Sequence, residues 1–124
     1  MGGGIERTIL SFAPLGEAPD LPRVKLATTE IEDSFSASGC RTVNIDPGYI
    51  DFFKAVLASF KEGPQKIYLG RGVYADPVLT FMDGRWDVFR WTFPDFRKGL
   101  YMEDFDAIRK IYKLDMRGPG RQGG

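Results

Sequence analysis

The change of hydrophobic period at Asp46-Pro47-Gly48 constrains the fold of this chain more than any other stretch. Before it, Val43 and Ile45 alternate with polar residues, which predicts a half-buried strand over residues 41–46. Proline presets φ for a turn and glycine can adopt the positive φ that follows, so the triplet predicts a tight turn. From Tyr49 to Lys61 the apolar residues recur at helical spacing, which predicts a helix. These residues are Ile50, Phe53, Val56, Leu57 and Phe60.

Further strands and helices follow from the same two periods. Strands are expected over residues 7–12, 66–69, 73–81 and 85–91, and helices over residues 21–39 and 101–112. Asp20 is the expected N-cap of the first helix, although a strand over residues 23–27 before a shorter helix stays open. Pro77 lacks the amide of a central ladder position, so it marks a sheet edge or a bulge. The order of elements predicts an α+β domain with a mainly antiparallel sheet and about three helices on one face.

Two glycine-containing turns separate the expected strands of the second half. Asp83-Gly84 is a hairpin signal between two strand-like runs. Gly70-Arg71-Gly72 opens the pattern Gly-x-Gly-x-x-Ala, the outline of a dinucleotide-binding fingerprint. That fingerprint requires a helix directly after it, and a strand is expected here instead. We therefore interpret Gly70–Ala75 as a strand-to-strand turn.

Composition bounds the class of protein. A chain of 124 residues predicts one domain, over residues 1–117, followed by a disordered glycine-rich tail at 118–124. The charges balance at 17 basic and 17 acidic residues, which gives no electrostatic argument for nucleic acid. No apolar run approaches the ~20 residues of a membrane helix. Cys40 is the single cysteine, which excludes an internal disulfide and indicates a reducing, cytoplasmic location.

Histidine is absent from the sequence. Its absence excludes Ser-His-Asp and Cys-His catalysis and every metal site that uses imidazole. Any acid–base chemistry must therefore use carboxylates, Lys, Tyr or Cys40.

Four motifs in order carry a family resemblance. They are Arg41–Tyr49, Lys54–Ser59, Ile67–Ala75 and Trp91–Arg97, with Lys25-Leu-x-Thr28 and Glu32 upstream. Together they resemble the prokaryotic family catalogued as domain of unknown function 4416, some members of which carry the label "GTP-binding protein". The chain departs from the pattern at Thr29, Asp76 and Phe96, where Asn, Glu and Tyr are expected. It also has no Gly-x-x-x-x-Gly-Lys-Ser/Thr loop, so GTP binding by the usual route is not supported.

The resemblance also implies an N-terminal strand-helix-strand that this chain lacks. The strand expected over residues 7–12 would then have an open edge. We therefore expect the isolated chain either to form a homo-oligomer, such as a dimer, or to be poorly soluble.

Several polar residues are candidates for a ligand site. Asp46 and Asp76 are candidate catalytic or metal-binding carboxylates, and with Glu32 and Asp95 they would suit a divalent cation such as Mg²⁺. The candidate ligand-binding residues are Arg41, Asn44, Lys54, Lys66, Trp91 and Asp95. The cations would neutralise a phosphate, and Trp91 or Phe93 would stack on a planar group.

Each candidate also has an ordinary structural interpretation. Asp46 can cap the helix expected from Tyr49, and the lysines can belong to a solvated charged face. The aromatic loop at 91–97 can seal a core edge, and we expect Trp91→Ala to cost ~3–5 kcal/mol even if the loop also binds a ligand.

Two functions stay open at this point. The first is a ligand-binding domain, with catalysis left open, for a phosphate-bearing metabolite or nucleotide. The alternative is a non-enzymatic protein-interaction domain that uses the aromatic loop and a hairpin edge.

Overall fold

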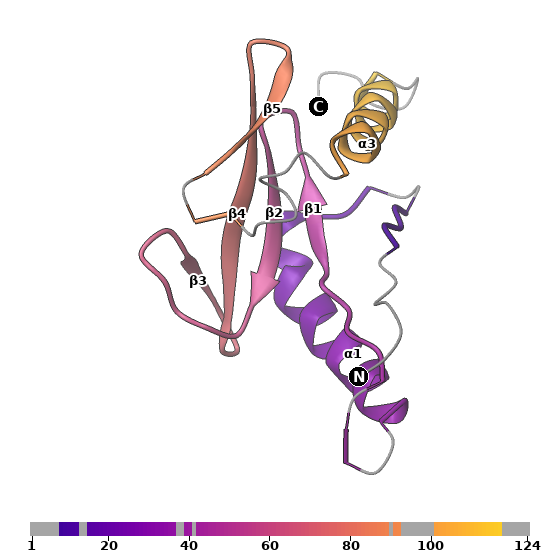
Figure 1. Ribbon diagram of the computed structural model, residues 1–124, viewed down its shortest axis with the longest axis vertical. Helices are drawn as coiled ribbons and strands as arrows, with labels where there is room; N and C mark the ends of the chain where they lie inside the picture. The colour runs from indigo at the N-terminus through magenta and orange to yellow at the C-terminus, as the bar shows by residue number, and fades with distance from the viewer. Residues whose placement is uncertain are drawn as a thin grey trace, which may run out of the picture.

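The computed structural model describes residues 8–12, 15–36, 39–40, 42–89, 91–92 and 101–117. Its helical elements are the 3₁₀ turn η1 (Ala18–Asp20) and the α-helices α1 (Leu21–Ser34) and α3 (Met102–Met116). Its strands are β1 (Gly48–Ile50), β2 (Lys54–Ser59), β3 (Ile67–Gly70), β4 (Val73–Met82) and β5 (Arg85–Val88). The strands form one antiparallel sheet in the order β1-β2-β4-β3, with β5 also paired to β4 (Figure 1). The predicted α+β class is confirmed, but the described residues hold two α-helices rather than about three.

The strand and helix predicted over residues 41–61 are wrong. Residues 43–47 have no regular structure, and β1 and β2 form an antiparallel hairpin in place of the helix. The cause is the run Ala55–Ala58, in which consecutive residues are buried or half-buried. Periodicity alone cannot separate a short continuous apolar run of this kind from a segment of buried helix.

The remaining elements follow the predictions closely. Helix α1 has Asp20 at its N-cap position and ends at Ser34, so the alternative strand over residues 23–27 is wrong. The helix α3 and the strands β3, β4 and β5 are confirmed within a few residues at their ends. Residues 8–12, by contrast, carry no strand. The tail at 118–124 lies outside the described residues.

Pro77 lies at a break in the ladder, as its missing amide predicts. Between β2 and β4 the register shifts from Ala55↔Leu79 to Val56↔Pro77, which leaves Val78 as the extra residue of a bulge. On the other side of β4, β3 and β5 do not pair with residues 76–78.

Residues 91 and 92 fill that gap beside β4. The carbonyl of Pro77 accepts a hydrogen bond from Trp91 Nε1 at 2.9 Å. The carbonyl of Val78 accepts one from Thr92 Oγ1 at 2.7 Å. The backbone acceptors freed by the bulge are therefore satisfied by side chains, as buried carbonyls require.

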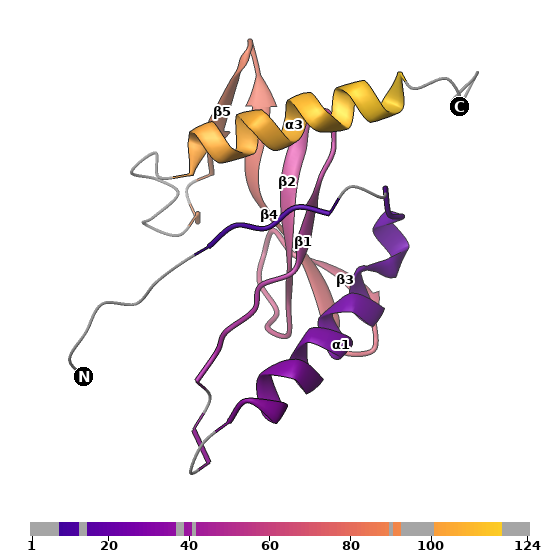
Figure 2. The same cartoon turned by 90° about the vertical axis from the view of Figure 1, so that its right-hand side faces the viewer.

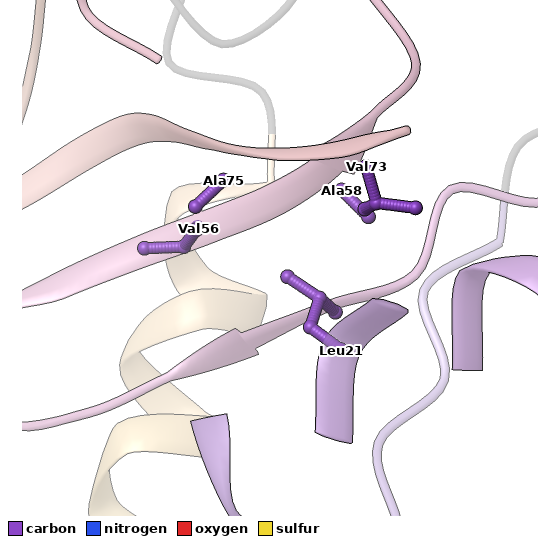
Figure 3. Close-up of a cluster of buried hydrophobic side chains, with 5 residues drawn as sticks. All are labelled: Leu21, Val56, Ala58, Val73 and Ala75. Atoms are coloured by element: carbon purple, nitrogen blue, oxygen red, sulfur yellow. The ribbon is translucent and has the colours of Figure 1, made fainter. Parts of the chain in front are cut away.

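The two helices pack against opposite faces of β2, which corrects the expectation of helices on one face. One core cluster joins Leu21 of α1 to Val56, Ala58, Val73 and Ala75 of the sheet (Figure 3). The second cluster joins Phe105 of α3 to Ala55, Val78, Leu79 and Trp86. Successive strand residues point to opposite faces, so Ala55 and Val56 contribute to different clusters. Figure 2 shows α3 crossing one end of the sheet and α1 lying along the other.

The tip of the β1–β2 hairpin is held by Asp51. Its Oδ1 accepts the amides of Phe53 at 2.8 Å and Lys54 at 2.9 Å, and its Oδ2 lies 2.7 Å from Lys54 Nζ. The tip also contacts α3, since Arg109 Nε donates to the carbonyl of Phe52 at 3.1 Å. The turn is thus fixed by one carboxylate and anchored to a helix.

Asp51→Ala is expected to lower the free energy of unfolding by about 2 kcal/mol, because two backbone amides lose their acceptor. Asp51→Asn keeps an oxygen for both amides and loses only a half-exposed ion pair, so it should cost about 0.5 kcal/mol. Urea unfolding of the two variants measures the difference. Equal losses would show that the charge, rather than the turn, is what matters.

Candidate functional site

The helix N-terminus expected beside Asn44 and Asp46 is not formed. Both side chains are exposed on the irregular segment before β1, and no helix begins at Tyr49 for Asp46 to cap. Gly48 does not adopt the positive φ expected of it. Arg41, Phe93 and Asp95 lie outside the described residues.

Lys66 and Asp76 are the two candidate residues that the structure brings together. Lys66 Nζ lies 4.0 Å from Asp76 Oδ2 and 3.1 Å from Ser59 Oγ, and Gln65 Nε2 donates to Asp76 Oδ1 at 3.0 Å. Strands β2 and β3 pair with opposite sides of β4, so the connection that ends in Gln65 and Lys66 must cross β4. Asp76 therefore fixes this crossing connection to the sheet, which is a sufficient structural reason for its burial.

Lys54 has an ordinary structural role. Its hydrogen bond to the carboxylate of Asp51 raises the pKa of Lys54, against the opposing effect of burial. Because the folded-state pKa is raised, the pair stabilises the fold below the unfolded pKa near 10.5 and loses that contribution as the pH rises further. Lys54 is therefore engaged within the hairpin rather than presented to a ligand.

Helix α1 buries two charged residues against the sheet. Lys25 is 9% exposed, with its ammonium 5.0 Å from the centroid of the Phe60 ring. Glu32 is 4% exposed, and its Oε2 accepts the amide of Ile45 at 2.7 Å. The second contact ties the segment before β1 to α1, which accounts for Glu32 without a ligand.

Trp91 is on the surface, which corrects its placement in the core. It is 44% exposed and lies flat on the ring of Phe89, with centroids 4.7 Å apart. The indole N–H is already used by the carbonyl of Pro77. Trp86 is the tryptophan that lies in the core.

A cleft at the N-terminal end of α1 was not predicted from the sequence. It consists of two adjoining cavities that share Pro19 and Leu69 in their walls. The first, of about 260 Å³, is lined by Pro19, Asp20, Pro22, Arg23, Leu69 and Arg71. The second, of about 220 Å³, is lined by Ala18, Pro19, Tyr49, Leu69 and Ala75. We call this pair of cavities the α1 cleft.

Two arginines from different elements line the first cavity of the α1 cleft. Arg23 lies in the first turn of α1, and Arg71 lies in the turn between β3 and β4. At the start of α1 the Leu21 amide already donates to the carbonyl of Ala18 and Pro22 has no amide, so the positive charge of this cavity comes from the two guanidinium groups. Asp20 lies in the same wall and pairs with Arg23 at 3.8 Å, so part of this positive charge is compensated.

Arg71 occupies an unusual backbone position. Gly70 pairs with Val73, so Arg71 and Gly72 form a two-residue hairpin turn, with φ of 57° and 77°. Such turns favour Asn, Asp or Gly at the first position, because a long side chain with positive φ is strained. Asp83-Gly84 shows the favoured composition in the neighbouring hairpin. The turn itself was predicted from the sequence. The presence of Arg71 at a turn position that favours Asn, Asp or Gly was the sequence signal that could have indicated the cleft.

Metal binding is not supported by the described part of the chain. Within it, no three His, Cys, Asp or Glu residues lie close enough to hold a metal ion. The predicted four-carboxylate site stays a prediction, since Asp95 lies outside the described residues.

The helices that the structure describes are also too short or too polar to cross a membrane.

Comparison with known proteins gives one match. Residues 1–112 match the model of the family described as "Domain of unknown function (DUF4416)". The match covers most of the chain, so the chain belongs to this family. No curated protein and no solved structure matches it.

Proposed function

We propose that this chain, as a member of the DUF4416 family, binds a small phosphate-bearing ligand in the α1 cleft. The observation that carries the proposal is the pair of arginines, Arg23 and Arg71, in the wall of one cavity. Guanidinium groups bind phosphate through two parallel hydrogen bonds. The site is binding rather than catalytic in this proposal, because the cavity offers no nucleophile beside a general base.

The strain at Arg71 supports a role in binding. A positive φ at a residue other than glycine costs of the order of 1 kcal/mol, and such strain is often found at functional sites. Asparagine at this position would form the same turn at lower conformational cost. Arginine at position 71 therefore does not stabilise the turn better than asparagine would. It does give the cleft a phosphate-binding group.

The expected test result separates a binding role from a structural one. Arg71→Asn should raise the melting temperature slightly, by relieving the strain, and should weaken phosphate binding about tenfold or more. Arg23→Gln should also weaken binding. Arg85→Gln, on the exposed β4–β5 hairpin, is the matched control and should leave binding unchanged.

Titration calorimetry and thermal shift with inorganic phosphate, pyrophosphate, ribose 5-phosphate and nucleoside monophosphates provide the measurement. A ligand at ~100 times its Kd stabilises the fold by about 2.7 kcal/mol, which is readily seen in a thermal melt. If none of these probes shifts the wild type, the proposal is wrong for this ligand class. It is equally wrong if binding persists unchanged in both cleft variants.

A further inference from the structure

Helix α1 has a charge distribution opposite to the one that stabilises an isolated helix. Its first turn holds no acidic residue and its last turn no basic one. Instead Arg23 and Lys25 lie near the N-terminus, and Glu30 and Asp33 lie near the C-terminus. Because the helix dipole favours the reverse arrangement, these charges cost stability in a single copy.

An apolar stripe runs along the exposed side of the same helix. Val24, Ala27 and Ile31 are spaced at i, i+3 and i+7, so they lie on one face of α1. All three are exposed, with Val24 at 36% and Ile31 at 46%. The buried residues Leu21, Lys25 and Glu32 lie on a different side of α1, and Leu21 packs on the sheet. Alanine at its centre would let another backbone approach closely.

We propose that a second copy of this chain packs its α1 antiparallel against this face, about a two-fold axis beside Ala27. The axis brings the Arg23–Val24 end of each helix beside the Glu30–Ile31 end of the other helix, so the same contact forms at both ends of the pair. Arg23 and Glu30, which oppose the dipole within one copy, then face each other across the pair. Within the described residues Glu30 makes no ion pair of its own, and Arg23 has only a long contact to Asp20.

This surface of α1 has a basic end, an apolar centre and an acidic end, so it is complementary to an antiparallel copy of itself. This favours a second copy over another partner. A closed two-fold contact requires the same patch on both subunits, with each element facing its complement. Two helices of 14 residues bury an area at the low end for a specific interface. The dimer should therefore be reversible, with a Kd in the micromolar range.

Sedimentation equilibrium over a concentration series tests the proposal. The buffer is free of phosphate, because Arg23 also belongs to the α1 cleft. Wild type should be a concentration-dependent dimer. Ile31→Glu should raise the Kd at least about tenfold, because it places a charge in the apolar stripe. Leu114→Glu on α3, at an even more exposed apolar position, should leave the Kd unchanged.

Charge reversal supplies a test that a folding defect cannot imitate. Arg23→Glu alone places Glu beside Glu30, and Glu30→Arg alone places Arg beside Arg23, so each variant should fail to dimerise by itself. An equimolar mixture restores both opposite-charge contacts and should form a heterodimer. A wild type that stays monomeric at millimolar concentration overturns the proposal. The proposal is also overturned if Ile31→Glu leaves the Kd of the dimer unchanged. The same holds if the mixture of Arg23→Glu and Glu30→Arg stays monomeric.

Discussion

Gly48→Ala is expected to lower the free energy of unfolding by about 3 kcal/mol or more, because the new methyl group has no space. A Cβ on Gly48 would lie 2.2 Å from the carbonyl oxygen of Val56 and 2.8 Å from Leu57 Cδ2. A backbone oxygen cannot turn aside as a side chain can. The hairpin must therefore open, and β2 contributes residues to both core clusters.

Gly16→Ala is the matched control for this experiment. A Cβ on Gly16 would meet no atom within 4 Å, and its φ is not in the left-handed region. Its effect should stay within about 0.5 kcal/mol. Thermal melts followed by circular dichroism should show a fall of about 10 °C or more for Gly48→Ala and almost none for Gly16→Ala. Similar melting temperatures for the two variants would refute the tight approach of β1 to β2.

The sequence predicted the second half of the sheet well because its turns are locally encoded. Arg71-Gly72 and Asp83-Gly84 both contain a glycine with positive φ, and each joins two antiparallel strands. Pro77 likewise indicated a bulge through its own chemistry, the absence of an amide. In each case the signal and its structural consequence lie within a few residues of one another.

The hairpin of β1 and β2 could not be predicted in the same way. The apolar run at Ala55–Ala58 is a strand because both of its faces are covered, by Leu21 of α1 on one side and Phe105 of α3 on the other. The two residues that cover these faces lie about 35 to 50 positions away along the chain. The hydrophobic periodicity of a short segment carries no information about such distant contacts.

The setting of the candidate residues was not predicted for a related reason. Asn44 and Asp46 were expected beside a helix N-terminus, and the structure has a strand there instead. The α1 cleft instead depends on how α1 packs beside the β3–β4 turn, which brings Arg23 and Arg71 to one cavity. Lys66 and Asp76 do meet, because the connection from β2 to β3, which ends in Lys66, crosses β4, which holds Asp76.

The two tryptophans give the second large prediction, and it reverses the expectation from sequence. Trp86 is 7% exposed, with its ring 5.2 Å from Phe81 and 5.9 Å from Phe105. Trp86→Ala should therefore lower the free energy of unfolding by about 3–5 kcal/mol. Trp91→Ala removes one hydrogen bond and one stacked contact from the surface, so it should cost about 1–2 kcal/mol.

Trp86→Phe distinguishes packing from polarity at the same position. The Nε1 of Trp86 is buried and has no hydrogen-bond acceptor within the described residues, so replacing the indole removes a polar group that costs free energy to bury. This gain offsets part of the lost ring volume, and Trp86→Phe should cost about 1–2 kcal/mol. Urea unfolding followed by circular dichroism avoids the change in fluorescence that each variant causes. If Trp91→Ala proved as costly as Trp86→Ala, the Trp91 side chain would be part of the core, against its observed exposure.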